Sequence, residues 1–275
     1  MQYAMPILNR VVLIAMAKPL IGIQLYTLRD QTENDFLGTI RRVAELGYEA
    51  VEFAGFFGAS PEDVRKVLEE TGLHAPSAHI GLQWSESPDR MWEAFAEQVA
   101  FTKAVGLQYV VAPWAPMPEN PHVEDVNRLA GMLKQASELV RAEGMTYGYH
   151  NHDFELKKVD GTPVIDRLLE QLTPEELIAE FDLGWVHVGG AEPVDYITRY
   201  AGRVPLAHFK DFGEGRNDTE IGAGVVNFKP VLDIAEQAGI QYIFVEQEAF
   251  KASSLDSAKI SLEYFKKNGY LQQKA

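Results

Sequence analysis

The feature that most constrains this chain is an alternation of amphipathic helices with short apolar strands, usually separated by a glycine. Glycine just past a helix adopts the left-handed conformation without a Cβ clash, so each such glycine marks the end of a helix. These glycines stand at positions 47, 72, 106, 144, 202 and 239. We predict strands at 21–25, 50–53, 75–79, 109–112, 145–150, 177–182, 204–209 and 242–246. We predict helices near 34–46, 61–71, 88–105, 123–143, 163–171, 193–201, 228–238 and 254–267.

Eight strand–helix units are typical of a single-domain α/β protein with the (β/α)₈ TIM-barrel fold, which usually takes about 250 residues. A doubly wound sheet is the alternative, but it needs no eighth unit and no closing helix. We assign 20–270 to the barrel and 1–19 to an N-terminal extension. Residues 11–16 are apolar but too few to span a membrane. The segment 15–17 (AMA) resembles a signal-peptidase site, yet only Arg10 is charged before it, so we favour an extension with Met16 as a second start.

The charge and the missing cysteines exclude several functions. The chain has 25 basic and 40 acidic residues, a formal net charge of −15, which argues against binding nucleic acid by phosphate neutralisation. It has no cysteine, which excludes disulfides and thiolate catalysis and suits a cytoplasmic protein. We therefore expect a small-molecule substrate and neither a nucleic-acid nor a membrane partner. The oligomeric state is open, a homo-oligomer included.

Titratable side chains gather where the predicted strands end. In a TIM barrel these ends face the active site, and side chains two residues apart on a strand share a face. Together, several carboxylates and imidazoles in one barrel would leave uncompensated charges unless a divalent ion were bound. A purely hydrogen-bonded polar cluster is the alternative. The residues concerned are Glu52, His79, His150, His152, Asp182, His208, Lys210 and Glu246.

Taken together, the strand-end motifs resemble those of the sugar phosphate isomerase/epimerase superfamily. These are xylose-isomerase-like TIM barrels that include inosose dehydratases and ketose 3-epimerases. The resemblance covers about residues 20–267 and rests on YHNHDFE at 149–155, FDLGW at 181–185, HFKD at 208–211, GAG at 222–224 before Asn227-Phe228, and VEQE at 245–248.

The resemblance implies one divalent metal ion, held by His150, Asp182, His208 and Glu246. Manganese is the expected ion, with cobalt, magnesium and zinc as alternatives, because a mixed set of nitrogen and oxygen ligands does not select sharply. Two positions depart from the epimerase pattern. His150 stands where those enzymes have a glutamate that is both ligand and base, and Trp185 stands where a histidine is usual. The first departure removes half of the two-glutamate proton shuttle.

Candidate roles follow for the remaining residues. His152 is the first candidate for general base, and a supporting partner or an alternative ligand is an equally good interpretation. Lys210 is expected to contact a substrate hydroxyl or an enolate oxygen, with a salt bridge to Asp211 or Glu248 as the alternative. Lys210 or Glu246 would become the leading candidate for the base if His152 were not one. We expect substrate contacts from Glu52, His79, Trp114 and Trp185.

Several functions remain open on the sequence. The leading interpretation is a metal-dependent isomerase or epimerase that removes the proton α to the carbonyl of a keto-sugar and stabilises the enediolate. The second is a lyase or dehydratase of a keto-cyclitol or 3-keto-glycoside. An AP-endonuclease-like nuclease and a non-catalytic sugar-binding barrel are further alternatives. The chain has no P-loop, and residues 222–224 follow a loop and not a strand, so we do not interpret them as a phosphate-binding motif.

Overall fold

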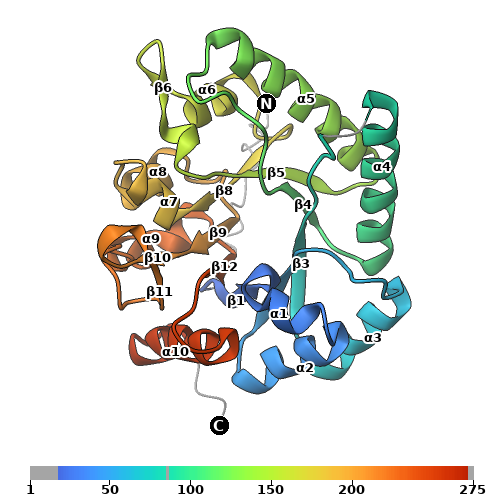
Figure 1. The fold of residues 1–275 in the computed structure, drawn as a ribbon, viewed down its shortest axis with the longest axis vertical. Helices are drawn as coiled ribbons and strands as arrows, with labels where there is room; N and C mark the ends of the chain where they lie inside the picture. Colours follow the sequence, from blue (N-terminus) through green and yellow to red (C-terminus); the bar gives the residue numbers. More distant parts are fainter. Residues whose placement is uncertain (1–17, 85–86, 272–275) are drawn as a thin grey trace, which may run out of the picture.

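Eight parallel strands close into a barrel in the computed structural model, which describes residues 18–84 and 87–271 (Figure 1). The predicted single-domain TIM barrel is therefore confirmed. Around the barrel, each strand pairs with its neighbours in the order β1, β2, β3, β4, β5, β8, β9, β12 and back to β1. The strands are β1 (Leu20–Gln24), β2 (Ala50–Phe53), β3 (His74–His79), β4 (Tyr109–Ala112), β5 (Thr146–His150), β8 (Ile178–Asp182), β9 (Leu206–Phe209) and β12 (Tyr242–Val245).

Helices surround the barrel, and each begins and ends close to its predicted position (Figure 1). The predicted helix ends agree because glycine caps fix them. For example, Gly47 and Gly239 follow the last residues of two helices with φ angles of 101° and 87°, in the left-handed region that only glycine adopts freely. The helices are α2 (Phe36–Leu46), α3 (Pro61–Thr71), α4 (Pro88–Val105), α5 (Val123–Ala142), α6 (Val164–Gln171), α8 (Pro193–Arg199), α9 (Lys229–Ala238) and α10 (Ser254–Lys267).

Short elements that the sequence pattern did not predict follow the strands at the carboxyl end of the barrel. Helix α7 (Leu183–Val188) begins directly after β8, where the Asp182 carboxylate accepts a hydrogen bond from the Trp185 amide at 2.9 Å. The others are the 3₁₀ turns η1 (Leu25–Leu28), η2 (Phe154–Leu156) and η3 (Glu214–Arg216), helix α1 (Arg29–Thr32), and the strand pairs β6 (Lys158–Val159) with β7 (Thr162–Pro163) and β10 (Asp211–Phe212) with β11 (Asp218–Thr219).

The amino end of the barrel interior is an apolar layer. It consists of Ala50, Val111, Ile178, Leu206 and Phe244, all buried, with Tyr109 and Tyr242 packed against them. A second, larger core lies between the strands and the helices. Among the described residues, no helix is long and apolar enough to cross a membrane. The expected N-terminal extension and its apolar run lie outside the described residues, apart from positions 18 and 19.

Candidate metal centre

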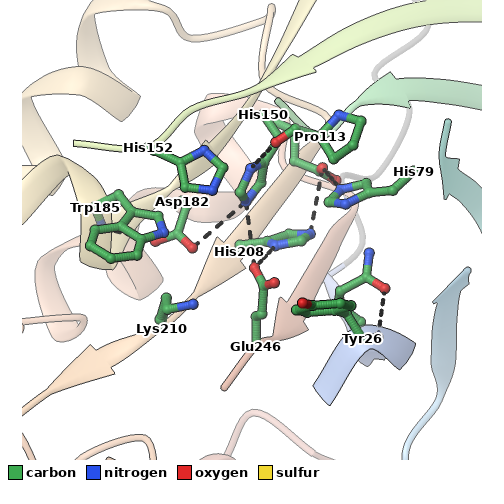
Figure 2. Close-up of polar contacts among 12 residues, drawn as sticks. Tyr26, His79, Pro113, His150, His152, Asp182, Trp185, His208, Lys210 and Glu246 are labelled. Atoms are coloured by element: carbon green, nitrogen blue, oxygen red, sulfur yellow. Dashed lines mark hydrogen bonds and ion pairs between the residues drawn. The ribbon is translucent and has the colours of Figure 1, made fainter. Parts of the chain in front are cut away.

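Four side chains from neighbouring strands converge at the carboxyl end of the barrel interior (Figure 2). Each offers one ligand atom, and these atoms all lie within 4.8 Å of one another. All four residues are buried. The strands β5, β8 and β9 end at or next to these positions, and β12 ends one residue before the fourth. We call this set the outer group: His150, Asp182, His208 and Glu246.

Two atoms of the outer group have the chemistry of free metal ligands. The Nδ1 of His150 lies 3.3 Å from the Pro113 carbonyl oxygen, which can only accept, so Nδ1 donates and Nε2 is the atom that can bind an ion once the imidazole is neutral. In the absence of an ion, burial would lower the pKa of His150, but Asp182 and Glu246 raise it to about 9. Asp182 accepts the Trp185 amide on Oδ1, which leaves Oδ2 available. Both His150 Nε2 and Asp182 Oδ2 are buried without a hydrogen-bond partner in the described chain, and they lie 3.7 Å apart. A divalent ion would satisfy both, so the residues fit such an ion.

A second set of buried ligand-type side chains lies against the first and shares one histidine with it. We call this set the inner group: Glu52, His79, Glu180 and His208, whose ligand atoms also lie within 4.8 Å of one another. The His79 Nε2 is 2.8 Å from Glu180 Oε2, and the His79 and His208 rings stack with centroids 5.1 Å apart. Sequence reasoning noted Glu180 only as the neighbour of Asp182 and gave it no role. The spacing does indicate a place near the site, because Glu180 lies two residues before Asp182 and shares the inward face of β8 with it.

Charges in these two groups depend strongly on one another. Burial alone would lower the pKa of His208, but the carboxylates of Glu180 and Glu52 raise it well above the usual value of histidine. Burial alone would raise the pKa of Glu180, but His208 and His79 lower it below the usual value of a carboxyl group. Glu180 is therefore ionised, which is the form that binds a cation.

A cavity of about 330 Å³ opens onto the outer group. Its lining includes the predicted residues His79, Trp114, His150, His152 and Glu246, together with Tyr26, Ala54, Pro113 and Glu248. Trp114 is 46% exposed, so its ring is accessible from the cavity. Glu52 is different: it has no exposed surface and does not line this cavity, so the structure places it beneath the site and not in its wall. A larger cavity of about 540 Å³ involves α4 and α5 and contains none of the predicted site residues.

Strand β5 ends at His150, as predicted, so His152 lies in the loop that follows the strand and not on the strand itself. The imidazoles of His150 and His152 are nevertheless neighbours, with ring centroids 5.2 Å apart. The His152 ring also lies 5.7 Å from that of Trp185 (Figure 2). Burial and the neighbouring His150 lower the pKa of His152 to about 4, so this imidazole is neutral at neutral pH.

A buried carboxyl group fixes the loop that carries His152. Glu155 accepts the His152 amide on Oε2 at 2.8 Å and the Tyr149 hydroxyl on Oε1 at 2.5 Å. Burial raises the pKa of Glu155 to about 7, against the effect of these hydrogen bonds. Glu155 therefore holds this loop in place and is not part of the outer group.

Lys210 is buried, and its ammonium group forms an ion pair with Glu248. This is one of the two salt bridges that the sequence offered as alternatives. The same ammonium lies 5.1 Å from the centroid of the Trp185 ring. Burial would lower the pKa of Lys210, but Glu246, Asp182 and Glu248 raise it. Lys210 therefore stays charged beside the outer group.

Asp211 does not pair with Lys210 but organises the following loop. Its carboxylate accepts hydrogen bonds from the amides of Gly222, Gly224 and Val226 at 2.9–3.1 Å. These amides are therefore already occupied. This agrees with the interpretation that residues 222–224 do not form a phosphate-binding motif.

The sequence profile of the xylose isomerase-like TIM barrel family matches residues 40–268. The chain belongs to this family. An inosose dehydratase from Lacticaseibacillus casei is 25% identical over 84% of this chain and 89% of the relative. Among solved structures, a sugar phosphate isomerase/epimerase from Parabacteroides distasonis superposes with a TM-score of 0.80 at 24% identity, covering 96% of this chain and 99% of the other. An L-ribulose 3-epimerase superposes with a TM-score of 0.71 at 15% identity, covering 90% and 93%.

Proposed function

We propose that this xylose isomerase-like barrel is a divalent-metal-dependent enzyme that removes the proton α to the carbonyl of a keto-sugar or related carbohydrate. The observation that carries the proposal is the outer group, in which His150 Nε2 and Asp182 Oδ2 are buried, face one another and have no hydrogen-bond partner among the described residues. A divalent ion bound there supplies stabilisation for the negative charge that develops on the carbonyl oxygen. We expect manganese, with cobalt, magnesium or zinc as alternatives.

His152 is the proposed general base. Its imidazole lines the cavity next to the outer group and is neutral at neutral pH, which is the form that accepts a proton. Its lowered pKa makes it a weaker base than a free imidazole, so its position next to the outer group is what supports this role. The Glu155 carboxyl group orients it through the backbone amide. Lys210, held by Glu248, is placed beside the outer group to stabilise an enolate oxygen or to contact a hydroxyl. The rings of Tyr26 and Trp114 line the cavity, where they can stack on the apolar C–H face of a carbohydrate.

After proton removal, the enediolate has three outcomes. Reprotonation at the neighbouring carbon gives isomerisation, reprotonation of the same carbon from the opposite face gives epimerisation, and loss of the β-substituent gives dehydration or another elimination. Epimerisation by two bases needs a second free base on the opposite face of the carbon. Here His150 replaces the usual glutamate and Lys210 is already paired with Glu248, which favours elimination as the second candidate function. The inosose dehydratase relatives also support it.

The test is proton exchange in heavy water over a panel of keto-sugars, keto-cyclitols and keto-glycosides, combined with metal analysis of the purified protein. We expect deuterium at the α carbon and about one divalent ion per chain. His152→Ala should reduce turnover by on the order of 10²–10⁴-fold and keep the ion. His150→Ala should lose the ion, because it removes a ligand.

His74→Ala is the matched control, since His74 is exposed at the start of β3 and away from the cavity. Equal metal loss in the His150 and His152 variants, or full activity of His152→Ala, would contradict the assignment. Tight sugar binding without exchange would favour a non-catalytic sugar-binding barrel. Cleavage at abasic sites in DNA would favour the nuclease alternative.

A further inference from the structure

His208 belongs to both groups, and its two ring nitrogens face different carboxylates. Nδ1 lies 2.8 Å from Glu246 Oε2, which belongs to the outer group. Nε2 lies 2.6 Å from Glu52 Oε2, which belongs to the inner group. When the His208 imidazole binds an ion it is neutral, with one N–H donor and one lone pair, so one nitrogen binds the ion while the other donates. Which nitrogen donates therefore decides which group holds the ion.

The surroundings of Glu52 favour donation from Nε2. Glu52 has no exposed surface, and its Oε2 also accepts a hydrogen bond from Gln24 Nε2 at 2.8 Å. The Gln24 amide therefore orients the Glu52 carboxylate independently of His208. Glu52 and Gln24 lie opposite one another in the register of β1 and β2, so the backbone fixes both side chains. Among the described residues, the Glu246 carboxylate has hydrogen-bond or ion-pair contacts only with the imidazoles of His208 and His150, so no donor orients it independently of the proposed ligands.

The outer group also contains an unpartnered imidazole nitrogen and an unpartnered carboxylate oxygen that lie close together. His150 Nε2 and Asp182 Oδ2 are both free there, one from each of two residues whose other polar atom is already bonded. In the inner group, His79 Nε2 contacts the Oε2 atoms of both Glu180 and Glu52, at 2.8 and 3.3 Å. Its free atoms are the second oxygens of these two carboxylates. The inner group thus already pairs its imidazoles with its carboxylates.

We propose that Glu52 is a positioning residue: it accepts the Nε2–H of His208, so that Nδ1 presents its lone pair to the outer group, and the inner group holds no ion of its own. This inference rests on the proposed metal site. A carboxylate that accepts the N–H of the ring nitrogen not bound to the ion fixes the tautomer and the ring orientation of the histidine. It also makes the ligand nitrogen more basic. Glu180 and His79 continue the same network, and His79 connects it to the wall of the cavity.

The first test is nitrogen NMR of the zinc-loaded full chain with ¹⁵N-labelled histidine. We expect the His208 spectrum to show a protonated Nε2 and a metal-bound Nδ1, with His150 bound through Nε2. A protonated Nδ1 with a metal-bound Nε2 on His208 would overturn the proposal. This measurement needs no variant, so it stands even if substitutions in the inner group prevent folding.

The second test is zinc affinity by calorimetry. Glu52→Gln should weaken binding by on the order of 10- to 100-fold, because the neutral amide is a weaker acceptor of the His208 N–H. Glu49→Gln is the matched control, since Glu49 lies just before the same strand and accepts the Ile21 amide at the amino end. It should leave the affinity unchanged. An unchanged affinity in Glu52→Gln would contradict a positioning role.

Metal stoichiometry separates the remaining outcomes. We expect one zinc ion per chain in the wild-type protein and in Glu180→Gln. Two ions per chain in the wild type, with one lost in Glu180→Gln, would overturn the proposal and make the inner group a second metal site. If the wild-type protein binds no divalent ion at all, the proposed function fails as well. One ion with an unchanged affinity in Glu52→Gln would contradict this inference alone.

Discussion

The two ends of the barrel interior differ completely, although the same strands build both. On β8, successive inward side chains are Ile178, Glu180 and Asp182, which belong to the apolar layer, the inner group and the outer group in turn. On β9, Leu206 and His208 follow the same order. Every second residue along these strands therefore lies one layer closer to the carboxyl end, first in the apolar layer, then among the proposed supporting residues, then among the proposed metal ligands.

The comparison separates stability from function. Apolar side chains at the amino end gain free energy when they leave water, and they need no partners. At the carboxyl end, buried carboxylates and imidazoles cost free energy unless each is paired or bound to an ion. His150 Nε2 and Asp182 Oδ2 are without hydrogen-bond partners in the described chain, so this end is built for a ligand at the expense of stability. Substitutions in the apolar layer should therefore lower stability and leave metal affinity unchanged, whereas substitutions in the outer group should lower metal affinity with little effect on stability.

The largest expected effect is that of Asp182→Asn. Asparagine keeps an oxygen that can accept the Trp185 amide but removes the negative charge from the outer group. We expect metal affinity to fall. Turnover should fall with it by at least roughly 10²-fold, because the ion contributes several kcal/mol to the stabilisation of the transition state. The thermal stability of the metal-free variant should change little, because the substitution keeps the size of the side chain and the acceptor of the Trp185 amide. A variant that loses stability without losing metal would contradict the separation of the two ends.

Leu206→Ala should give the opposite result. Leu206 has no exposed surface and belongs to the apolar layer, so its truncation should lower the free energy of unfolding by about 2–5 kcal/mol. Metal affinity of the folded variant should stay unchanged. Urea unfolding and calorimetry would measure the two quantities. Ile260→Ala, at an exposed position on α10, is the control and should change the stability by less than about 0.5 kcal/mol.

A pH dependence should arise at the carboxyl end from Glu155. Its pKa is about 7 in the folded protein against 4.5 ordinarily, so the folded state holds the proton more tightly. Its contribution is complete below pH 4.5, is lost as the pH rises to about 7, and is constant above that. The loss is on the order of 1–3 kcal/mol. Melting temperatures of chelator-treated protein from pH 4.5 to 8 should fall more steeply for the wild type than for Glu155→Gln. Equal slopes would refute the assignment.

The smallest effect on stability should come from Trp114→Ala at the rim of the cavity. Because the side chain is 46% exposed, the free energy of unfolding should change by less than about 0.5 kcal/mol. The KM for a carbohydrate substrate should rise by about tenfold, equivalent to about 1.4 kcal/mol of lost stacking. Steady-state kinetics would measure it, with Ile260→Ala again as the control. A fall in kcat with an unchanged KM would assign Trp114 a role other than binding.

The sequence by itself determined the fold and brought the candidate ligands to one end of the barrel, and the family resemblance selected four of them as the expected metal ligands. Helix and strand periodicity and the glycine caps are local properties, and eight such units leave little choice of architecture. Parallel strands bring their carboxyl ends together, so polar residues at the strand ends had to meet. Asp182, followed by Leu-Gly-Trp, is also a helix N-cap signal, and it would have predicted α7 from the sequence.

Only the tertiary structure decided how these side chains divide their work. The burial of Glu52, the contact of Glu180 with His79, the pairing of Lys210 with Glu248 and the two partners of His208 depend on the stagger of neighbouring strands and on side-chain rotamers. For example, β8 and β9 pair Asp182 with His208 and place Glu180 beside Leu206. A sequence gives the order of residues along each strand. It does not give the offset between strands, and that offset sets which nitrogen meets which carboxylate.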